Sequence, residues 1–209
     1  TDPDQMVSFG TSGHRGSSLD TAFNEAHIAS ITQAIIEYRA QQGTAGPLFI
    51  AKDTHGLSLP AWKTAIEVLH SAGVEVLAER EDEYTPTPAL SRAIIRYNRE
   101  HAGGPQADGI VVTPSHTPPR DGGFKYNPPN GGPADTDATS WIADRANELM
   151  ADYKSIRRTP YEQIADQVTR FDYRTPYCRE LSLVIDMDLI ANSGLRIGAD
   201  PMGGASVQY

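Results

Sequence analysis

We expect an α/β fold, a three-layer sandwich in which helices cover a mostly parallel, mixed sheet. Short apolar segments with the length of buried strands alternate along the 209 residues with longer segments whose apolar side chains recur at helical spacing. This alternation is typical of a largely parallel sheet with helices packed on its faces. Hydrophobic residues make up 39% of the chain, which is enough to form a core.

The first half of the chain contains the clearest helix. Apolar residues recur at helical spacing from Asn24 to Gln42, Asn24 is a suitable N-cap, and Gly43 is a suitable stop. Small residues and one aromatic over 7–16 indicate a strand end that turns into a loop. The other expected elements of this half are a strand at 48–51, a helix at 58–72 capped by Ser58, and a strand at 74–77.

The second half continues the alternation of strands and helices, but the pattern becomes irregular after Lys154. We therefore expect a first domain at 1–175, and at 176–209 a linker helix and the first strand of a second, incomplete domain. A single strand cannot bury both of its faces, so we expect the chain to be part of a longer protein. The expected elements are a helix at 87–101, a strand at 109–113, a helix at 135–153 capped by Asp135 or Thr136, a short helix at 162–168, a helix at 180–192 and a strand at 194–200.

The charge balance limits the possible partners. The chain has 18 basic and 27 acidic residues and a formal net charge of -9, which argues against a nucleic-acid-binding protein. An anionic substrate remains possible, because a pocket on an acidic protein can be locally positive. No apolar run is long enough to span a membrane. The single Cys178 excludes an internal disulfide, and with no secretory segment at the start we expect a cytoplasmic protein.

The stretch most suggestive of chemistry follows the strand expected at 109–113, where prolines and glycines are concentrated. Ligands of open α/β sheets bind beyond the carboxyl ends of strands, and Ser115 would lie at such an end. The flanking prolines stiffen the loop, and a hydroxyl held in one place is suited to a displacement reaction. His116 and Lys125 can supply positive charge or proton transfer beside it.

This loop, together with Thr-Ser-Gly-His-Arg-Gly at 11–16 and Lys-Asp-Thr-His at 52–55, resembles the α-D-phosphohexomutase family. The resemblance runs from Phe9 to Ala205, with the motifs in the order and at the spacing of the family. It implies the first domain and the beginning of the second domain of a four-domain enzyme. The implied partners are a hexose phosphate substrate and the remaining domains of the same enzyme, with no nucleic acid and no membrane.

The resemblance also implies an activity and a set of site residues. The enzyme would be an isomerase that interconverts glucose 1-phosphate and glucose 6-phosphate, with glucose 1,6-bisphosphate as intermediate and activator. Ser115 matches the serine that carries the phosphoryl group, and His116 matches a residue for proton transfer or positioning. Lys125 matches a general acid or base, and Arg15 an active-site arginine close to it. The expected substrate-binding residues are Thr113, Lys125, Arg15 and His14, and for His14 a structural role is favoured.

The implied cofactor is one Mg²⁺ ion. In the family it is held by an Asp-x-Asp-x-Asp-Arg loop and a phosphoserine oxygen, so Ser115 would contribute one ligand through its phosphate. The acidic loop does not occur in this sequence, and the remaining ligands are expected beyond residue 209. We interpret Asp186 and Asp188 as a solvated helix face. Thr117 stands where the family usually has asparagine, which changes the hydrogen bonds available to the loop.

Other functions are weighed beside this one. Within the family, a phosphomannomutase or a phosphoglucosamine mutase is the alternative. From other classes, a non-catalytic sugar-phosphate-binding module would use the same cleft, and a serine hydrolase would need a buried aspartate that orients His116. Asp53, Thr54 and His55 either border the cleft or cap a helix. A zinc site formed by histidines is disfavoured, since no supporting ligand pattern is present.

Overall fold

The computed structural model describes residues 2–10 and 13–209, so Thr11 and Ser12 of the first motif lie outside the described residues. A six-stranded sheet in the order β1-β5-β4-β2-β3-β6 forms its centre. The strands are β1 (His14–Ser17), β2 (Leu48–Lys52), β3 (Val76–Ala78), β4 (Asp108–Val112), β5 (Asp121–Asn127) and β6 (Thr169–Arg170). The longer helices are α1 (Glu25–Gln42), α2 (Ser58–Ser71), α3 (Thr87–Glu100) and α4 (Thr136–Met150).

The sheet is mixed but mostly parallel, as the sequence predicts. The strands β4, β2, β3 and β6 are parallel to one another, whereas β5 is antiparallel to both of its neighbours, β4 and β1. Only β5 is therefore reversed among the strands of the described chain. Because β1 and β5 lie together at one edge, the first motif is brought next to the segment that contains Lys125.

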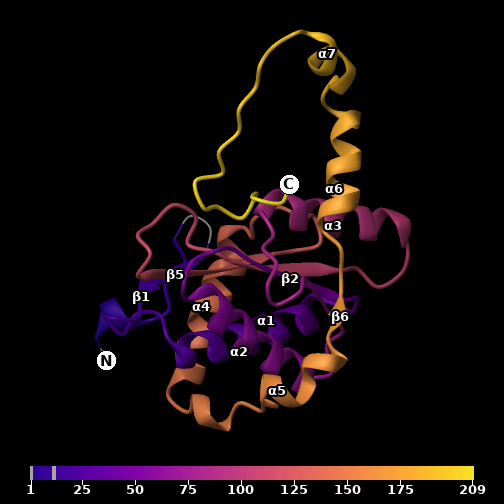
Figure 1. Ribbon diagram of the computed structural model, residues 1–209. Helices are drawn as coiled ribbons and strands as arrows, with labels where there is room; N and C mark the ends of the chain where they lie inside the picture. The colour runs from indigo at the N-terminus through magenta and orange to yellow at the C-terminus, as the bar shows by residue number, and fades with distance from the viewer. Residues whose placement is uncertain (1, 11–12) are drawn as a thin grey trace.

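Helices cover both faces of the sheet (Figure 1), which confirms the three-layer arrangement. Alternate side chains along β2 point to opposite faces, so Ile50 packs with α1 and α2 while Phe49 packs with α3. The larger core holds Ile31, Trp62 and Ile142 from α1, α2 and α4, all with no exposed surface. The smaller core, on the α3 side, holds Phe49, Leu90, Ile94, Val111 and Tyr173.

The helix ends test the capping predictions. The Asn24 side chain accepts hydrogen bonds from the backbone N–H groups of residues 26 and 27, and Gly43 ends α1 with a φ of 69°. Asp135 caps α4 through the N–H of Ala138, also as expected. The prediction for Ser58 is wrong, because Leu57 is the N-cap of α2 and the Ser58 hydroxyl donates instead to Asp53, at 2.6 Å.

Several elements differ from the sequence prediction, among them the short strand β6, which was not expected. Strand β5 was not expected, because its Asp-Gly-Gly start is typical of a turn, yet pairing with β4 and β1 makes it extended. The helix expected at 180–192 is interrupted, with α6 (Arg174–Glu180) and α7 (Met187–Asn192) separated by a 3-10 turn at Leu181–Leu183. Residues 194–200 are irregular and not a strand, since no neighbouring strand pairs with them in the described chain.

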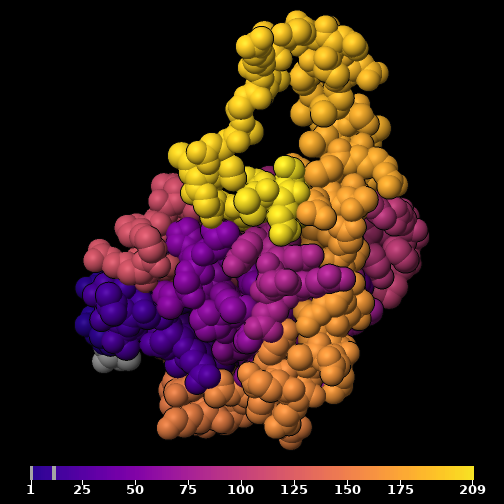
Figure 2. Space-filling view, in the orientation of Figure 1, coloured from indigo at the N-terminus to yellow at the C-terminus, as the bar shows by residue number. Residues whose placement is uncertain are grey.

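The segment that follows α6 stands away from the rest of the molecule. Figure 2 shows it as an arm that rises from the body and then returns to it, so that the last residues lie against the body again. The body is completed by the short α5 (Tyr161–Ile164) and 3-10 turns at Pro3–Gln5, Tyr153–Ser155 and Ala165–Gln167. Among the helices of the described residues, none combines the length and the apolar character needed to cross a membrane.

Candidate functional site

The candidate site lies beyond the carboxyl ends of β2 and β4, where open α/β sheets bind ligands. Ser115 follows β4, and Asp53 to His55 follow β2, so the parallel pairing of these strands brings the two loops together. A cavity of about 400 Å³ opens between them, which is sufficient for a small-molecule ligand. Its lining includes Asp53, His55, Thr85, Thr87, Thr113, Ser115 and, from the returning arm, Met202–Ala205.

Lys125 is the cation closest to the candidate nucleophile. Its ammonium group donates a 2.8 Å hydrogen bond to the hydroxyl of Ser115, although it comes from β5 and the serine from the preceding loop. Burial, reinforced by the nearby charge of Arg15, lowers the pKa of Lys125, and the charge of Asp53 opposes this shift. The sequence-predicted pair of Ser115 and Lys125 is therefore in direct contact.

Two glycines make this contact possible. A Cβ on Gly123 would lie 2.2 Å from the carbonyl oxygen of Thr113 and 2.5 Å from the Cα of Pro114, so the loop lies directly on β5 at this point. A Cβ on Gly13 would lie 2.6 Å from the Cγ of Lys125. The absence of side chains at these two positions leaves room for the loop and for the lysine stem.

Arg15 reaches the same face of the sheet. In the antiparallel pairing of β1 with β5 it lies opposite Gly123, diagonally from Lys125, and successive side chains alternate between faces. Its side chain is exposed, whereas that of Lys125 is largely buried. The charge of Arg15 is one of the causes that lower the pKa of Lys125, which agrees with their proximity.

The backbone of Ser115 has an unusual conformation. Its φ is 76°, in the left-handed region that costs a residue with a side chain about 1–2 kcal/mol. The N–H of Ser115 donates to the hydroxyl oxygen of Thr113, at 2.9 Å. That hydroxyl donates in turn to Asp53, at 2.5 Å. Local hydrogen bonds therefore stabilise the strained turn that projects the serine.

Asp53 is the centre of this hydrogen-bond network. One carboxylate oxygen accepts from the backbone N–H of His55 and the hydroxyl of Ser58, at 3.0 and 2.6 Å. The other accepts from the hydroxyl of Thr113 and from Nδ1 of His55, at 2.5 and 2.7 Å. The segment 52–55 therefore borders the cleft, and its aspartate holds the loop of Ser115 instead of capping a helix.

Two of the expected substrate-binding residues, Thr113 and His14, have other hydrogen-bond partners in the structure. The Thr113 hydroxyl is engaged on both sides, with Ser115 and Asp53, and its side chain supports the loop. His14 is 1% exposed, stacks on His27, and bonds through Nε2 to the carbonyl of Ala22, at 2.8 Å. Burial lowers the pKa of His14 to about 4, so the ring is neutral and structural. The substrate-binding assignment of His14 is corrected accordingly.

His116 is exposed beside Ser115, and the described part of the chain holds no hydrogen bond between the two side chains. A serine hydrolase would require an aspartate behind this histidine. The aspartate present, Asp53, contacts His55 instead, and Nε2 of His55 points to the carbonyl of Thr117 at 3.0 Å. The geometry therefore does not form a Ser-His-Asp triad.

Comparison with known proteins identifies the family of the chain. The family model for the phosphoglucomutase/phosphomannomutase alpha/beta/alpha domain I matches residues 6–152. The chain belongs to this family. A phosphoglucomutase of Komagataeibacter xylinus is 55% identical over 208 residues, which cover 98% of this chain and 37% of that protein. A phosphomannomutase of Mycoplasma pneumoniae is 35% identical over 125 residues, which cover 56% of this chain and 21% of that protein.

The fold agrees with this family assignment. The crystal structure of parafusin, a phosphoglucomutase from Paramecium, in its open form, superposes with a TM-score of 0.76 at 22% identity. The superposition covers 94% of this chain and 39% of that one. The chain thus spans little more than a third of the length of the relatives that it matches.

A magnesium site in this domain of the phosphoglucomutase/phosphomannomutase family would need oxygen ligands. In the described residues, no cluster of three or more acidic, histidine or cysteine side chains is arranged to hold a metal. The Asp53 carboxylate is already occupied by four hydrogen bonds, and Asp186 caps α7 through the N–H of Leu189. The described residues therefore form no complete metal site of their own.

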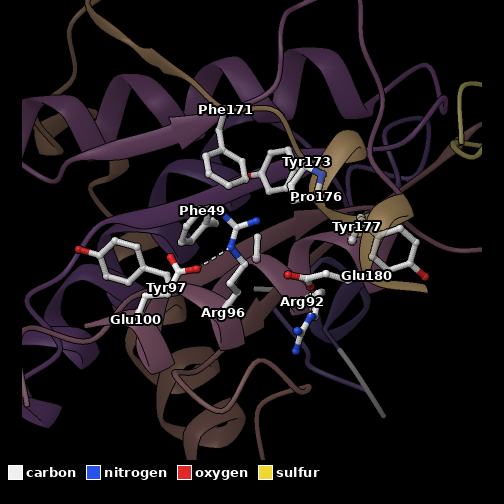
Figure 3. Close-up of a pocket in the computed structure, with 12 residues that line it drawn as sticks. Phe49, Arg92, Arg96, Tyr97, Glu100, Phe171, Tyr173, Pro176, Tyr177 and Glu180 are labelled. Atoms are coloured by element: carbon white, nitrogen blue, oxygen red, sulfur yellow. Dashed lines mark hydrogen bonds and ion pairs between the residues drawn. The ribbon is translucent and has the colours of Figure 1, made fainter. Parts of the chain in front are cut away.

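A second cavity lies between α3 and α6 (Figure 3). Its volume is about 50 Å³, little more than the space of one or two waters. Edge-on contacts join Phe49 with Phe171 and Tyr173 along one wall. Arg92 is paired with Glu180, and Arg96 with Glu100, so the nearby charges are neutralised. This cavity marks the packing of α6 on the body and is too small for a sugar phosphate.

Sequence reasoning missed one part of the main cavity wall. Residues 85–87, at the start of α3, line it, and α3 begins without a side-chain cap. The signal for this position was present, because the Pro-rich stretch follows β3 and the carboxyl ends of parallel strands share one edge of the sheet.

Proposed function

We propose that this chain is the nucleophile-bearing part of a phosphoglucomutase that interconverts glucose 1-phosphate and glucose 6-phosphate. The observation that carries the proposal is the hydrogen bond from Lys125 to Ser115 at the mouth of the cavity. The 55% identical phosphoglucomutase favours glucose over mannose or glucosamine phosphates as the substrate. Mannose 1-phosphate and glucosamine 1-phosphate are the alternatives within the family.

In the proposed reaction, phosphorylated Ser115 gives its phosphoryl group to the 6-hydroxyl of glucose 1-phosphate. The P–O bond to the serine breaks, the sugar hydroxyl loses its proton, and glucose 1,6-bisphosphate forms. After the sugar reorients, the 1-phosphoryl group returns to Ser115 and glucose 6-phosphate leaves. Phosphoryl groups and protons balance over the cycle, and the bisphosphate is both intermediate and activator.

Each cation of the site has a role in this scheme. Lys125 lies at hydrogen-bond distance from the serine oxygen, so it can stabilise the negative charge that the oxygen acquires as the phosphoryl group leaves. Its lowered pKa suits it to donate a proton to that oxygen or remove one. Exposed Arg15 is free to bind a substrate phosphate, and exposed His116 to position the sugar or transfer a proton.

The proposed cofactor is one Mg²⁺ ion per complete enzyme. When bound, it would neutralise charge on the transferring phosphoryl group. From this chain only a phosphate oxygen on Ser115 would ligate it, and the other ligands would come from outside residues 1–209. We also propose a cytoplasmic location, in keeping with a single, exposed and unpaired Cys178.

The remaining domains of the enzyme are the proposed protein partner of the arm. Large apolar side chains are exposed along it, and monomeric surfaces seldom carry such clusters without a contact. We propose that residues 1–175 form the first domain and that 176–209 lead into the second. The exposed large apolar residues of the arm are Leu183, Val184, Ile185, Met187, Leu189, Ile190, Leu195, Ile197, Met202 and Val207.

The function is tested by turnover of the full-length protein that contains this chain. Purified wild type and Ser115→Ala are assayed with glucose 1-phosphate, Mg²⁺ and a trace of glucose 1,6-bisphosphate, with glucose 6-phosphate as the measured product. Wild type should turn over and the variant should lose all measurable activity while keeping its circular dichroism spectrum. Equal rates for the two proteins would refute the assignment of the nucleophile. Binding of glucose 1-phosphate without turnover would support a non-catalytic binding module instead.

A further inference from the structure

The loop that holds Ser115 is restrained on both sides, and His55 takes part in both restraints. Before the serine, Asp53 holds the Thr113 hydroxyl that accepts from the Ser115 N–H, and Nδ1 of His55 contacts the same carboxylate oxygen. After the serine, Nε2 of His55 contacts the carbonyl oxygen of Thr117, at 3.0 Å. One imidazole ring therefore bridges the two ends of the segment 113–117.

The hydrogen-bond geometry determines where the protons lie. The Thr113 hydroxyl accepts from the N–H of Ser115, so its own hydrogen points to Asp53. Three of the four contacts to Asp53 come from groups that donate to it, which is the pattern of an ionised carboxylate, and such a carboxylate also accepts from Nδ1 of His55. Because the carbonyl of Thr117 can only accept as well, both ring nitrogens of His55 must donate. A ring that donates from both nitrogens is an imidazolium.

The charges around His55 agree with a cationic ring. Asp53, just after β2, contacts the ring. The charge of Asp121, at the start of β5, also raises the pKa of His55. Burial lowers the pKa of His55, but the Thr117 carbonyl and the Asp53 carboxylate outweigh it, and the net pKa is raised. The other cation near this part of the loop is Lys125, whose ammonium group donates to the Ser115 hydroxyl.

The backbone conformation of Ser115 explains why the loop needs to be restrained at both ends. A φ of 76° is costly for serine, and a loop without restraints would relax from it. Relaxation would move the hydroxyl away from Lys125 and from the cavity. Since Thr117 has no hydrogen-bond partner for its buried hydroxyl in the described residues, its carbonyl is the group that ties this side of the loop.

We propose that His55, as an imidazolium, is a positioning residue that fixes Ser115 for phosphoryl transfer. The inference rests on the proposed function for its catalytic readout. It also assigns a state to the protein that can be observed without catalysis, namely protonation of both ring nitrogens of His55 near neutral pH.

The catalytic test compares His55→Gln, His55→Arg and a matched control, His101→Gln, in the full-length protein. Glutamine is neutral and cannot donate to both acceptors in the same way, whereas arginine is always charged and has several donors. His101 bonds to one carbonyl, that of Tyr97, on the exposed end of α3. We measure kcat and KM for glucose 1-phosphate between pH 6 and 9, with circular dichroism melting curves for each variant.

His55→Gln should lower kcat about 100-fold while KM changes little, because misplacement of a reacting group by about 1 Å has an effect of that order. His55→Arg should recover at least about 10-fold of this loss, and His101→Gln should match wild type. As pH rises through the raised pKa of His55, wild type should lose activity. The arginine variant should lack that decline, since its charge does not titrate. A glutamine variant as active as wild type, or an arginine variant no better than glutamine, would overturn the proposal.

A spectroscopic test observes the wild-type protein and does not depend on turnover; a variant is needed only to assign its signals. In ¹⁵N-histidine-labelled wild type at pH 7, both ring nitrogens of His55 should resonate in the protonated range, assigned by loss of the signals in His55→Arg. One protonated and one bare nitrogen would refute the inference even if the enzyme turns over. If wild type did not turn over but the His55 ring were doubly protonated, the proposed function would be refuted, while the role of His55 in holding the loop would stand.

Discussion

The ammonium group of Lys125 lies 2.8 Å from the hydroxyl of Ser115 and donates a hydrogen bond to it. The two residues are ten positions apart, on β5 and on the loop that precedes it, and the tight approach of that loop to Gly123 brings them together. Because the lysine is largely buried and the serine is exposed at a cavity, the pair combines a fixed cation with an accessible hydroxyl.

Replacement of Lys125 by methionine should lower kcat by about 100- to 1000-fold, since one preorganised donor to a developing oxyanion contributes an effect of this size. KM for glucose 1-phosphate should change less than kcat. Lys63→Met is the matched control, because Lys63 pairs with Glu81 on a different part of the surface. Steady-state assays of both variants decide the matter, and a Lys125→Met enzyme within about three-fold of wild type would contradict the assigned role.

Gly123→Ala should displace the nucleophile loop. The added Cβ would meet the backbone of Thr113 and Pro114 at 2.2 to 2.5 Å, contacts that only a backbone shift can relieve. We expect kcat to fall by at least about 10-fold with the fold retained. Gly132→Ala serves as control, because its Cβ would meet only the Asn130 side chain, at 3.5 Å. Equal activity of the two variants would show that the loop does not need this close approach.

The sequence predicts most of the sheet and helices, because their patterns are local. Asn24 and Gly43 delimit α1 as expected, and the β-branched run before the Ser115 loop becomes β4. Strand β5 is not predicted from the sequence, because Gly122 and Gly123 are typical of a turn. Its extended conformation depends on pairing with two neighbouring strands, β4 and β1. Such pairing is a tertiary effect that local propensity does not contain.

At the site, too, local features could be predicted from the sequence and tertiary ones could not. The chemical types at Ser115, Lys125 and Arg15 could be recognised along the chain, and the structure brings them to one face. The central role of Asp53 could not be predicted, because it depends on four hydrogen bonds from three residues, one of which, Thr113, is brought close only by the fold. His14 was misplaced because its neighbours in sequence lie at the site, whereas strand alternation turns its ring into the core.

Stability should depend strongly on the buried ion pair beside the site. Lys52 and Glu79 are 1% and 2% exposed and lie 3.3 Å apart, and burial raises the pKa of Glu79 to about 7. Lys52→Met leaves a carboxylate without its cation and should cost about 3–5 kcal/mol in the free energy of unfolding at pH 8.

The double variant Lys52→Met/Glu79→Gln should be less destabilised than Lys52→Met alone, because the neutral amide carries no buried charge. Urea denaturation of the three proteins measures the differences. If the single variant were as stable as wild type, the pair would not contribute as the structure indicates.

The buried His14 predicts a pH dependence of stability. Its pKa is about 4 in the folded protein against 6.5 for an ordinary histidine, because burial and the neighbouring His27 disfavour the charged ring. The unfolded chain therefore binds more protons between these pH values. Stability should be complete above pH 6.5 and should decrease by up to about 3 kcal/mol as the pH falls toward 4.

His14→Phe retains a stacked ring that cannot titrate, so its unfolding free energy should change less over this pH range. Some dependence should remain, because the pKa of His27 is also lowered by burial. Chemical denaturation at pH 7 and at pH 5 gives the comparison. An identical loss of stability in the variant and in wild type would exclude His14 as a source.

The central claim is that Ser115 carries the phosphoryl group. Full-length protein is incubated with glucose 1,6-bisphosphate, quenched, digested, and analysed by mass spectrometry for the peptide that contains residues 113–125. We predict close to one phosphate per chain on Ser115 and none in Ser115→Ala. The phosphate should persist while excess glucose 1-phosphate turns over, and it should be replaced by the substrate's phosphate when that phosphate is ¹⁸O-labelled, because each cycle returns a phosphoryl group from the sugar to the serine. A peptide that stays unmodified while the enzyme turns over, or a phosphate on another residue that turns over at the catalytic rate, would contradict the account.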